Sequence, residues 1–141
     1  MKRAAIVVGP HHSGKSRTLR EFLKPLLRIS SRARRFLLDA RTGAVLSQSL
    51  EERVPNGAVL SQTLEERRVA STDAFIARYG HFTYLVCAAR PPEEPGSLYT
   101  PLITALERQG FSVFTVRVNP GQPASFYEAR AHDIVEYLRG A

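Results

Sequence analysis

Residues 9–16 read Gly9-Pro10-His11-His12-Ser13-Gly14-Lys15-Ser16 and fit the pattern G-x-x-x-x-G-K-[ST] at every constrained position. The two glycines leave the backbone free to curl, so that successive N–H groups can point at a β-phosphate. Lys15 would then reach the β- and γ-phosphates, and the Ser16 hydroxyl would coordinate Mg²⁺. A helix that begins near Lys15 would add the positive end of its dipole to the same spot. The stretch therefore predicts a site for the phosphates of a nucleotide.

The segments on both sides of this loop have the periodicity that it requires. Residues 4–8 form a continuous apolar run, which predicts a buried parallel strand that ends at the first glycine. After the loop, one apolar helical face is predicted by Leu19, Phe22, Leu23, Leu26 and Leu27. Pro25 falls inside this pattern and lacks a backbone N–H, so we expect the helix to kink or loosen near Glu21.

Strand, loop and helix in this order resemble the P-loop NTPase superfamily. The resemblance implies a three-layer α/β fold with a mainly parallel sheet and an NTP bound with Mg²⁺ at the carboxyl end of the first strand. It also implies hydrolysis or transfer of the γ-phosphate, by a small triphosphatase or, as an alternative, by a small nucleotide or metabolite kinase. A further alternative is a non-catalytic or partner-activated nucleotide-binding switch associated with nucleic acid. Residues 9–16 and the adjacent Arg17 would bind the nucleotide, with Lys15 acting in catalysis and Ser16 on the metal. ATP is favoured over GTP because the chain has no Asn-Lys-x-Asp guanine motif.

Length and composition point to a modest intracellular domain. The 141 residues, 43% of them hydrophobic, predict one domain that spans residues 1–141. The single cysteine, Cys87, lies in an apolar run and is expected to be a buried side chain, and it excludes a disulfide within the chain. No segment resembles a signal peptide or a membrane span, so we expect a cytoplasmic protein.

The formal net charge of +7 raises the question of a polyanionic partner. The basic residues are scattered along the chain, which a bias in composition alone would produce. One cluster stands out between the first helix and the next strand: Arg28, Arg32, Arg34 and Arg35. This cluster is either a solvated loop or a contact for nucleic acid or an acidic protein partner.

The rest of the chain alternates between strand and helix patterns, which predicts right-handed crossovers and a parallel sheet. A hairpin is expected where residues 36–39 turn back into residues 44–48. Later strands are predicted over residues 82–88 and 111–118, and helices after Ser71, from Thr100 and after Ser125. The spacing Ser125-x-x-Glu128 predicts a capping box for the last helix.

An internal duplication covers residues 43–56 and 57–70. Its first eleven residues, Gly-Ala-Val-Leu-Ser-Gln-Ser-Leu-Glu-Glu-Arg, recur fourteen residues later with one change from serine to threonine. The turn at residues 55–57 would let the second copy fold back beside the first. Both copies keep S/T-x-x-E, as Ser49 to Glu52 and Thr63 to Glu66, which predicts a capped helical turn after each strand.

The sequence does not identify the second acid that an NTPase uses to hold Mg²⁺. The middle strand runs into Arg90 with no acid at its end, so Asp39 is the strand-end candidate, with a turn residue as the alternative. Glu51 is a further catalytic candidate, as are Glu52, Glu65, Glu66 and Asp73. The alternative role of the glutamates is to cap the predicted helical turns. Arg90 would stabilise charge on a γ-phosphate or be an exposed loop arginine. Parallel topology would gather four segments around residues 9–16: the region after Asp39, the duplication, residues 90–96 and residues 119–123.

Overall fold

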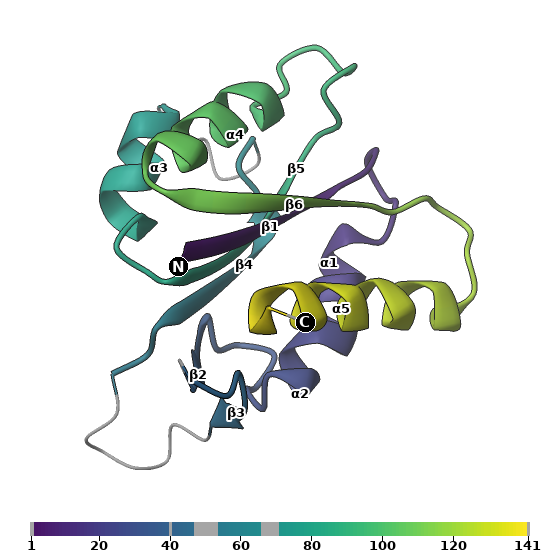
Figure 1. The fold of residues 1–141 in the computed structure, drawn as a ribbon. Helices are drawn as coiled ribbons and strands as arrows, with labels where there is room; N and C mark the ends of the chain where they lie inside the picture. Colours follow the sequence, from purple (N-terminus) through teal and green to yellow (C-terminus); the bar gives the residue numbers. More distant parts are fainter. Residues whose placement is uncertain (1, 40, 47–53, 66–70, 141) are drawn as a thin grey trace.

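The structure is a computed structural model that describes residues 2–39, 41–46, 54–65 and 71–140. Within these ranges the chain is an α/β fold in which strands and helices alternate (Figure 1). The elements, in chain order, are β1 (Lys2–Val8), α1 (Lys15–Arg17), η1 (Thr18–Leu23), α2 (Lys24–Leu26), β2 (Arg35–Leu38), β3 (Val45–Leu46), β4 (Gly57–Thr63), α3 (Thr72–Tyr79), β5 (Tyr84–Ala89), α4 (Tyr99–Arg108), β6 (Phe111–Arg117) and α5 (Ala124–Arg139).

The described strands form one six-stranded sheet in the order β3-β2-β4-β5-β1-β6. Strand β1 is parallel to both neighbours, with Ala5 opposite Val86 of β5 and Phe114 of β6. Strand β4 is parallel to β5, whereas β2 runs antiparallel to β4 and to β3. The predicted mainly parallel sheet with one hairpin is confirmed. The loop at residues 9–14 follows the strand that lies between β5 and β6.

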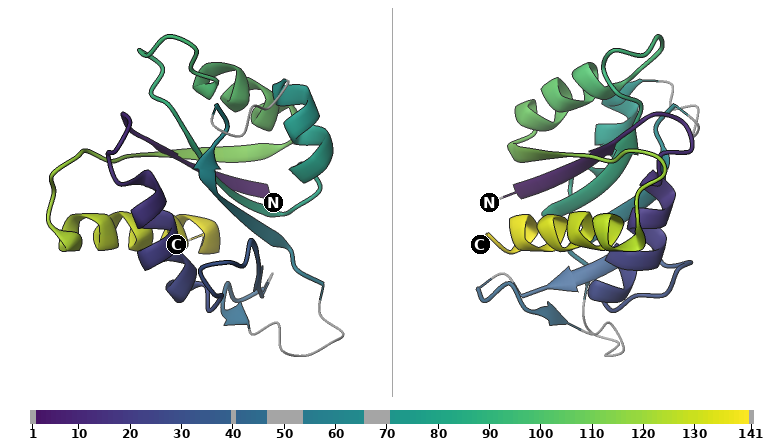
Figure 2. Two further views of the ribbon diagram at one scale, coloured as in Figure 1. Left: turned by 180° about the vertical axis from the view of Figure 1, so that it is seen from behind. Right: turned by 90° about the vertical axis from the view of Figure 1, so that its right-hand side faces the viewer.

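Helices cover both faces of the sheet and give it three layers (Figures 1 and 2). Because successive side chains of a strand point to opposite faces, β1 supplies both cores. Ala5 and Val7 join the core under η1 and α5, while Ile6 joins the core under α3 and α4. The near-continuous burial of β1 and β5 is what the apolar run at residues 4–8 predicts for a central parallel strand.

The first helix widens in its middle. Residues of η1 are π-helical, and the backbone N–H of Lys24 donates to the carbonyl of Leu19, five residues earlier. Pro25 has no N–H to offer the preceding turn, so the wider turn is one way to accommodate it. The expected loosening near Glu21 is confirmed, and the apolar face still buries Leu19, Leu23 and Leu27 completely.

The two copies of the duplication take different places in the sheet. The first supplies the short strand β3, which pairs with the outer side of β2, with Val45 opposite Leu38. The second supplies β4, which lies on the other side of β2 and also pairs with β5. The expectation that the second copy would fold back beside the first is wrong, because β2 lies between them. Both predicted S/T-x-x-E turns include residues outside the described ranges.

Two features fix the position of β4. The side chain of Asn56 pairs with the backbone of Leu38: its Nδ2 donates to the Leu38 carbonyl at 2.7 Å, and its Oδ1 accepts from the Leu38 N–H at 3.0 Å. Gly57 lies against the ring of Phe36, and a Cβ at this position would overlap that ring. The Pro55-Asn56-Gly57 segment therefore acts as a strand junction rather than as a free turn.

The helix starts are partly as predicted. Ser71 caps α3, accepting a hydrogen bond from the Ala74 N–H at 3.0 Å, as expected. The capping box at Ser125 is wrong, because α5 begins at Ala124 with Pro123 at the N-cap position, which places Ser125 inside the first turn. In the part of the chain that the structure describes, no helix has both the length and the apolar character needed to cross a membrane.

Candidate functional site

Residues 9–14 form a tight loop between the carboxyl end of β1 and the start of α1. Its backbone takes left-handed conformations at His12 (φ 59°) and at Gly14 (φ 98°). Gly9 has no room for a side chain either, because a Cβ there would overlap Ser13 Oγ and lie 2.7 Å from the carbonyl oxygen of Val118. Both glycines of the motif are therefore required by the observed backbone.

Lys15 is 8% exposed and its side chain folds back over the loop. Its Nζ donates a hydrogen bond to the carbonyl of Gly9 and another, of 3.0 Å, to the carbonyl of Pro10. The amine is thus held at the mouth of a cavity of 380 Å³ that residues 11–17, Ser61 and Thr63 line. A cation held over an open loop is suited to an anionic ligand.

A buried hydroxyl inside the loop has no hydrogen-bond partner. Ser13 is 1% exposed, and its Oγ is one of two such side-chain atoms in the described part of the chain. The Ser13 N–H, by contrast, donates to the Pro10 carbonyl at 3.1 Å. An unsatisfied buried polar atom is costly unless a ligand or water completes it. The hydroxyl packs against Gly9, so a ligand oxygen would satisfy it only if the loop adjusts around the ligand.

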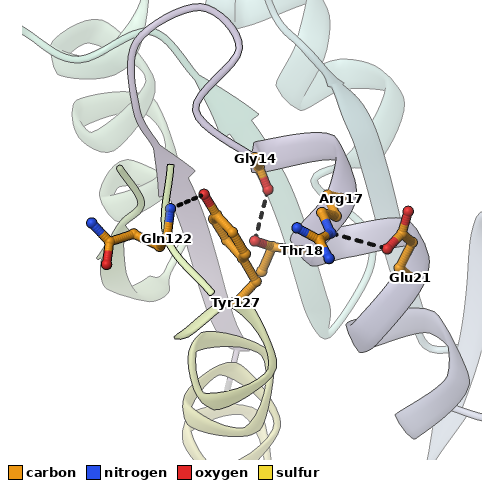
Figure 3. Close-up of polar contacts among 6 residues, drawn as sticks. All are labelled: Gly14, Arg17, Thr18, Glu21, Gln122 and Tyr127. Atoms are coloured by element: carbon orange, nitrogen blue, oxygen red, sulfur yellow. Dashed lines mark hydrogen bonds and ion pairs between the residues drawn. The ribbon is translucent and has the colours of Figure 1, made fainter. Parts of the chain in front are cut away.

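Helix α5 supports the loop from the other side (Figure 3). The ring of Tyr127 packs beside Gly14, and its hydroxyl donates to the carbonyl of Asn119 at 2.6 Å. Thr18 closes the turn after the loop through an Oγ1 bond of 2.8 Å to the Gly14 carbonyl. The guanidinium of Arg17 lies 5.3 Å from the Tyr127 ring centroid and forms an ion pair with Glu21. No motif in the sequence connected Tyr127 with the loop.

The second copy of the duplication forms one wall of the cavity. Ser16 Oγ donates to the carbonyl of Ser61 on β4 at 3.2 Å, and Thr63 lies at the carboxyl end of the same strand. No motif in the sequence marked Ser61, and Thr63 was predicted only as a helix cap. The sequence did predict that the duplication would adjoin the loop, and residues 57–63 do so.

Arg90 is brought to the loop, as predicted. It follows β5 and lines a small cavity together with His11, Lys15, Thr63 and Glu94. The side chain of Glu65, another of the predicted catalytic candidates, holds the loop that carries Arg90. Glu65 Oε1 accepts from the Arg90 N–H at 3.1 Å and Oε2 accepts from the Leu98 N–H at 2.7 Å. Glu65 therefore fastens the segment after β5 to the end of β4.

Asp39 lies at the opposite end of the sheet from the loop at residues 9–14. Because β2 is antiparallel to β4, its carboxyl end meets the amino ends of the parallel strands. There Asp39 Oδ1 accepts from the N–H groups of Arg41 at 2.8 Å and Thr42 at 3.0 Å. These bonds lower the pKa of the carboxyl below its ordinary value. Asp39 is therefore a turn residue, which was the alternative to its predicted role as the acid on the magnesium side. The structure does not bring it to Ser16. Strand direction is the reason for this correction.

Other predicted residues divide between the site and the rest of the surface. His11 and His12 are exposed on the loop, with ring centroids 3.9 Å apart. Residues 119–123 adjoin the loop, since Val118 pairs with Val8 through an N–H to carbonyl bond of 2.9 Å. Asp73 is exposed on α3. Glu51, Glu52 and Glu66 lie outside the described ranges, so their predicted roles stay predictions.

In the described part of the site, the Ser16 hydroxyl could serve as one ligand of a metal ion that arrives with a phosphate. Mg²⁺ takes oxygen ligands and commonly keeps several waters beside substrate phosphates and one or two carboxylates. The Ser16 hydroxyl is exposed toward the cavity and fits one such position. Among the described residues, no group of three His, Cys, Asp or Glu side chains is placed to hold a metal by itself.

Comparisons with protein-family models, with curated proteins and with solved structures found no match for this chain. The functional assignment therefore has to be made from the geometry of the loop and its surroundings.

Proposed function

We propose that this chain is a P-loop nucleoside triphosphatase that binds Mg-ATP at residues 9–16 and hydrolyses or transfers the γ-phosphate. One observation carries the proposal: the loop between β1 and α1 has glycines where a side chain would not fit, and it contains an unpartnered buried Ser13 hydroxyl and a retained Lys15 amine. Each of these three features is expected of a loop that closes around a phosphate.

The proposed chemistry relies on positioning and on charge. Lys15 would leave the carbonyls of Gly9 and Pro10 and turn to the β- and γ-phosphates, where its charge-assisted bonds are stronger. Ser16 would exchange the Ser61 carbonyl for the metal ion, which neutralises charge on the phosphates. Arg90 lies close enough to Lys15 to share one cavity with it, which supports a role in stabilising γ-phosphate charge.

The fold supports the same proposal at a coarser level. The loop follows a central strand of a mainly parallel sheet, at the edge where the carboxyl ends of β1, β4, β5 and β6 meet. Ligands of open α/β sheets bind at that edge. We therefore infer a three-layer fold of the P-loop type.

A second function, a nucleotide-binding switch that a partner activates, is favoured by one specific observation. In the described ranges, the carboxylate nearest to the end of β4 is Glu65, and both of its oxygens already accept backbone N–H groups. Glu94 lines the small cavity beside Lys15 and Arg90. If neither Glu94 nor a partner orients the attacking water, the nucleotide would bind with slow turnover.

The deciding experiment measures phosphate release from Mg-ATP by the wild type and by Ser16→Ala. The triphosphatase is supported if the wild type releases phosphate steadily and Ser16→Ala lowers the release rate at least tenfold. The control Ser125→Ala, on the exposed first turn of α5, should leave the release rate unchanged. Tight binding without release supports the switch instead. Failure of the wild type to bind any nucleoside triphosphate would contradict both.

A further inference from the structure

A basic groove of 740 Å³ adjoins the cavity of the phosphate loop. Its walls come from the first helix, from the connector before β2, and from the middle of β4. Five of its described lining residues are cationic: Arg17, Arg20, Lys24, Arg32 and Arg34. The predicted cluster in the connector is thus split, because Arg32 and Arg34 line this groove, whereas Arg28 and Arg35 are not among its lining residues. The Arg35 guanidinium lies 5.9 Å from the centroid of the Phe82 ring.

The charge in the groove is poorly balanced within the described residues. The carboxylate of Glu21 is paired with Arg17 at 3.1 Å. Arg20 donates to the Ser61 hydroxyl at 3.1 Å, and neither Arg20 nor Arg34 forms an ion pair in the described part of the chain. Like charges held close together repel, and a bound anion relieves that repulsion.

The floor of the groove is a buried lysine. Lys24 is 2% exposed and its Nζ donates to the carbonyl of Ser31 at 2.9 Å. Burial lowers its pKa, and the nearby charges of Arg20 and Arg34 lower it further. Three cations therefore converge on one region of the groove, which an anionic group of a ligand would stabilise.

We propose that this groove binds a small phosphate ester beside the terminal phosphate of the nucleotide. The inference rests on the proposed function, since Ser16, Arg17 and Ser61 line both the groove and the loop cavity and join them into one surface. The ester's phosphate would lie among Arg20, Lys24 and Arg34, and its other end would reach toward Ser16.

Size and lining favour a small ligand over a nucleic-acid strand. A volume of 740 Å³ is within the range of about 300–1,000 Å³ that small-molecule sites occupy. Proteins that bind single strands commonly stack bases on aromatic side chains. The described residues that line the groove include no aromatic side chain.

This arrangement would make the ligand a phosphoryl acceptor. A hydroxyl oxygen of the ester would bond to the γ-phosphorus as the bond from that phosphorus to the β,γ-bridging oxygen breaks. ADP leaves with that bond's electron pair, and the hydroxyl proton passes to water. The proposed transfer then needs no reactant other than the ester and ATP.

The test is a titration of full-length protein, saturated with a non-hydrolysable ATP analogue and Mg²⁺, with ribose 5-phosphate as the probe and ribose as its uncharged control. Binding is followed through the Nε–Hε signals of the arginine side chains by NMR. We expect saturable shifts of the Arg20 and Arg34 signals with ribose 5-phosphate and none with ribose.

Arg20→Ala and Arg34→Ala should each weaken binding of ribose 5-phosphate about tenfold, which corresponds to the loss of one charge-assisted contact. The control Arg108→Ala, on the exposed end of α4, should leave binding unchanged.

Three results would overturn the inference: no saturable binding of the ester, equal binding by Arg20→Ala, or a single-stranded oligonucleotide that binds this groove while ribose 5-phosphate does not. Lys15→Ala separates the two proposals, because it should bind the nucleotide about tenfold to a hundredfold more weakly and still bind the ester. Ester binding by a wild type that never binds ATP would contradict the proposed function and leave the groove as an anion site.

Discussion

The ring of Tyr127 lies directly against Gly14, so that a Cβ added at Gly14 would come within 2.5 Å of the ring's Cε1 atom. The same glycine has a φ of 98°, a backbone conformation that residues with a side chain rarely adopt. Helix α5 and the loop at residues 9–14 are thus fitted to each other, so α5 adjoins the candidate site although no motif in it is typical of nucleotide binding.

Gly14→Ala should therefore damage the loop for two reasons, overlap with Tyr127 and backbone strain. We expect a loss of stability of about 1–3 kcal/mol, in the range of overpacking and strain effects, and a large loss of ATP affinity. Thermal unfolding measures the loss of stability, and calorimetric titration measures the loss of ATP affinity. The control Gly110→Ala has a φ of 93° and open space around its Cβ, and it lies at the amino end of β6, away from the loop, so it should share the strain and retain ATP affinity. Equal ATP affinity in wild type and Gly14→Ala would contradict the role given to this contact.

The duplication provides its own matched pair of variants. Leu60 of the second copy is 1% exposed, whereas Leu46, its counterpart in the first copy, is half-buried on a short edge strand. Leu60→Ala should lower the free energy of unfolding by about 2–5 kcal/mol, and Leu46→Ala should lower it by clearly less. Chemical denaturation of the two variants measures the difference. Equal losses would show that the two copies are equivalent in the folded protein.

The turn at Asp39 predicts a pH dependence of stability. The N–H groups of Arg41 and Thr42 favour the ionised carboxyl and lower its pKa from 3.8. A carboxyl whose folded-state pKa is depressed contributes stability above its unfolded pKa, and this contribution disappears as the pH falls through the folded value. The stability advantage of wild type over Asp39→Asn should therefore be constant above about pH 5 and shrink below about pH 4. An advantage that stays constant down to pH 2 would contradict this assignment.

Cys87 provides a reporter of unfolding. It is completely buried in β5. Burial is the larger cause, and the negative charge of Glu65 the smaller one, that raise the pKa of its thiol to about 12. Because the thiolate is the reactive form, a thiol reagent at pH 8 should leave the native protein unmodified and should label it only as fast as it opens. Labelling with a disulfide reagent, with and without denaturant, measures this. Rapid stoichiometric labelling of native protein would show that β5 is accessible.

Much of the fold followed from local patterns. The run at residues 4–8, the motif at residues 9–16 and the capped helix after Ser71 each lie where periodicity and capping chemistry predict. Pro25 predicted a loosened helix because a missing N–H is a local property. These predictions succeeded since each depends on neighbours close in sequence.

The capping box at Ser125 was a local error, because α5 begins one residue earlier, at Ala124. The other errors arose where pairing between distant segments decides the structure. Two nearly identical copies occupy an edge strand and a central strand, which no local pattern distinguishes. The direction of β2 moved Asp39 away from the loop, although its strand and turn were both predicted. Tyr127 and Ser61 reach the site through packing between distant elements, so their residue types alone carried no signal.

The most direct test of the central claim is a calorimetric titration of Mg-ATP into wild type, Lys15→Ala and Lys2→Ala. Lys2 is a matched control, since its Nζ also donates to a backbone carbonyl, that of Gly80 at 2.6 Å, but it lies at the other end of β1. Loss of one charge-assisted contact of about 1.5–3 kcal/mol should weaken ATP binding by about tenfold to a hundredfold in Lys15→Ala. Lys2→Ala should bind ATP as the wild type does. Equal affinity of wild type and Lys15→Ala for ATP would contradict the phosphate site at residues 9–16.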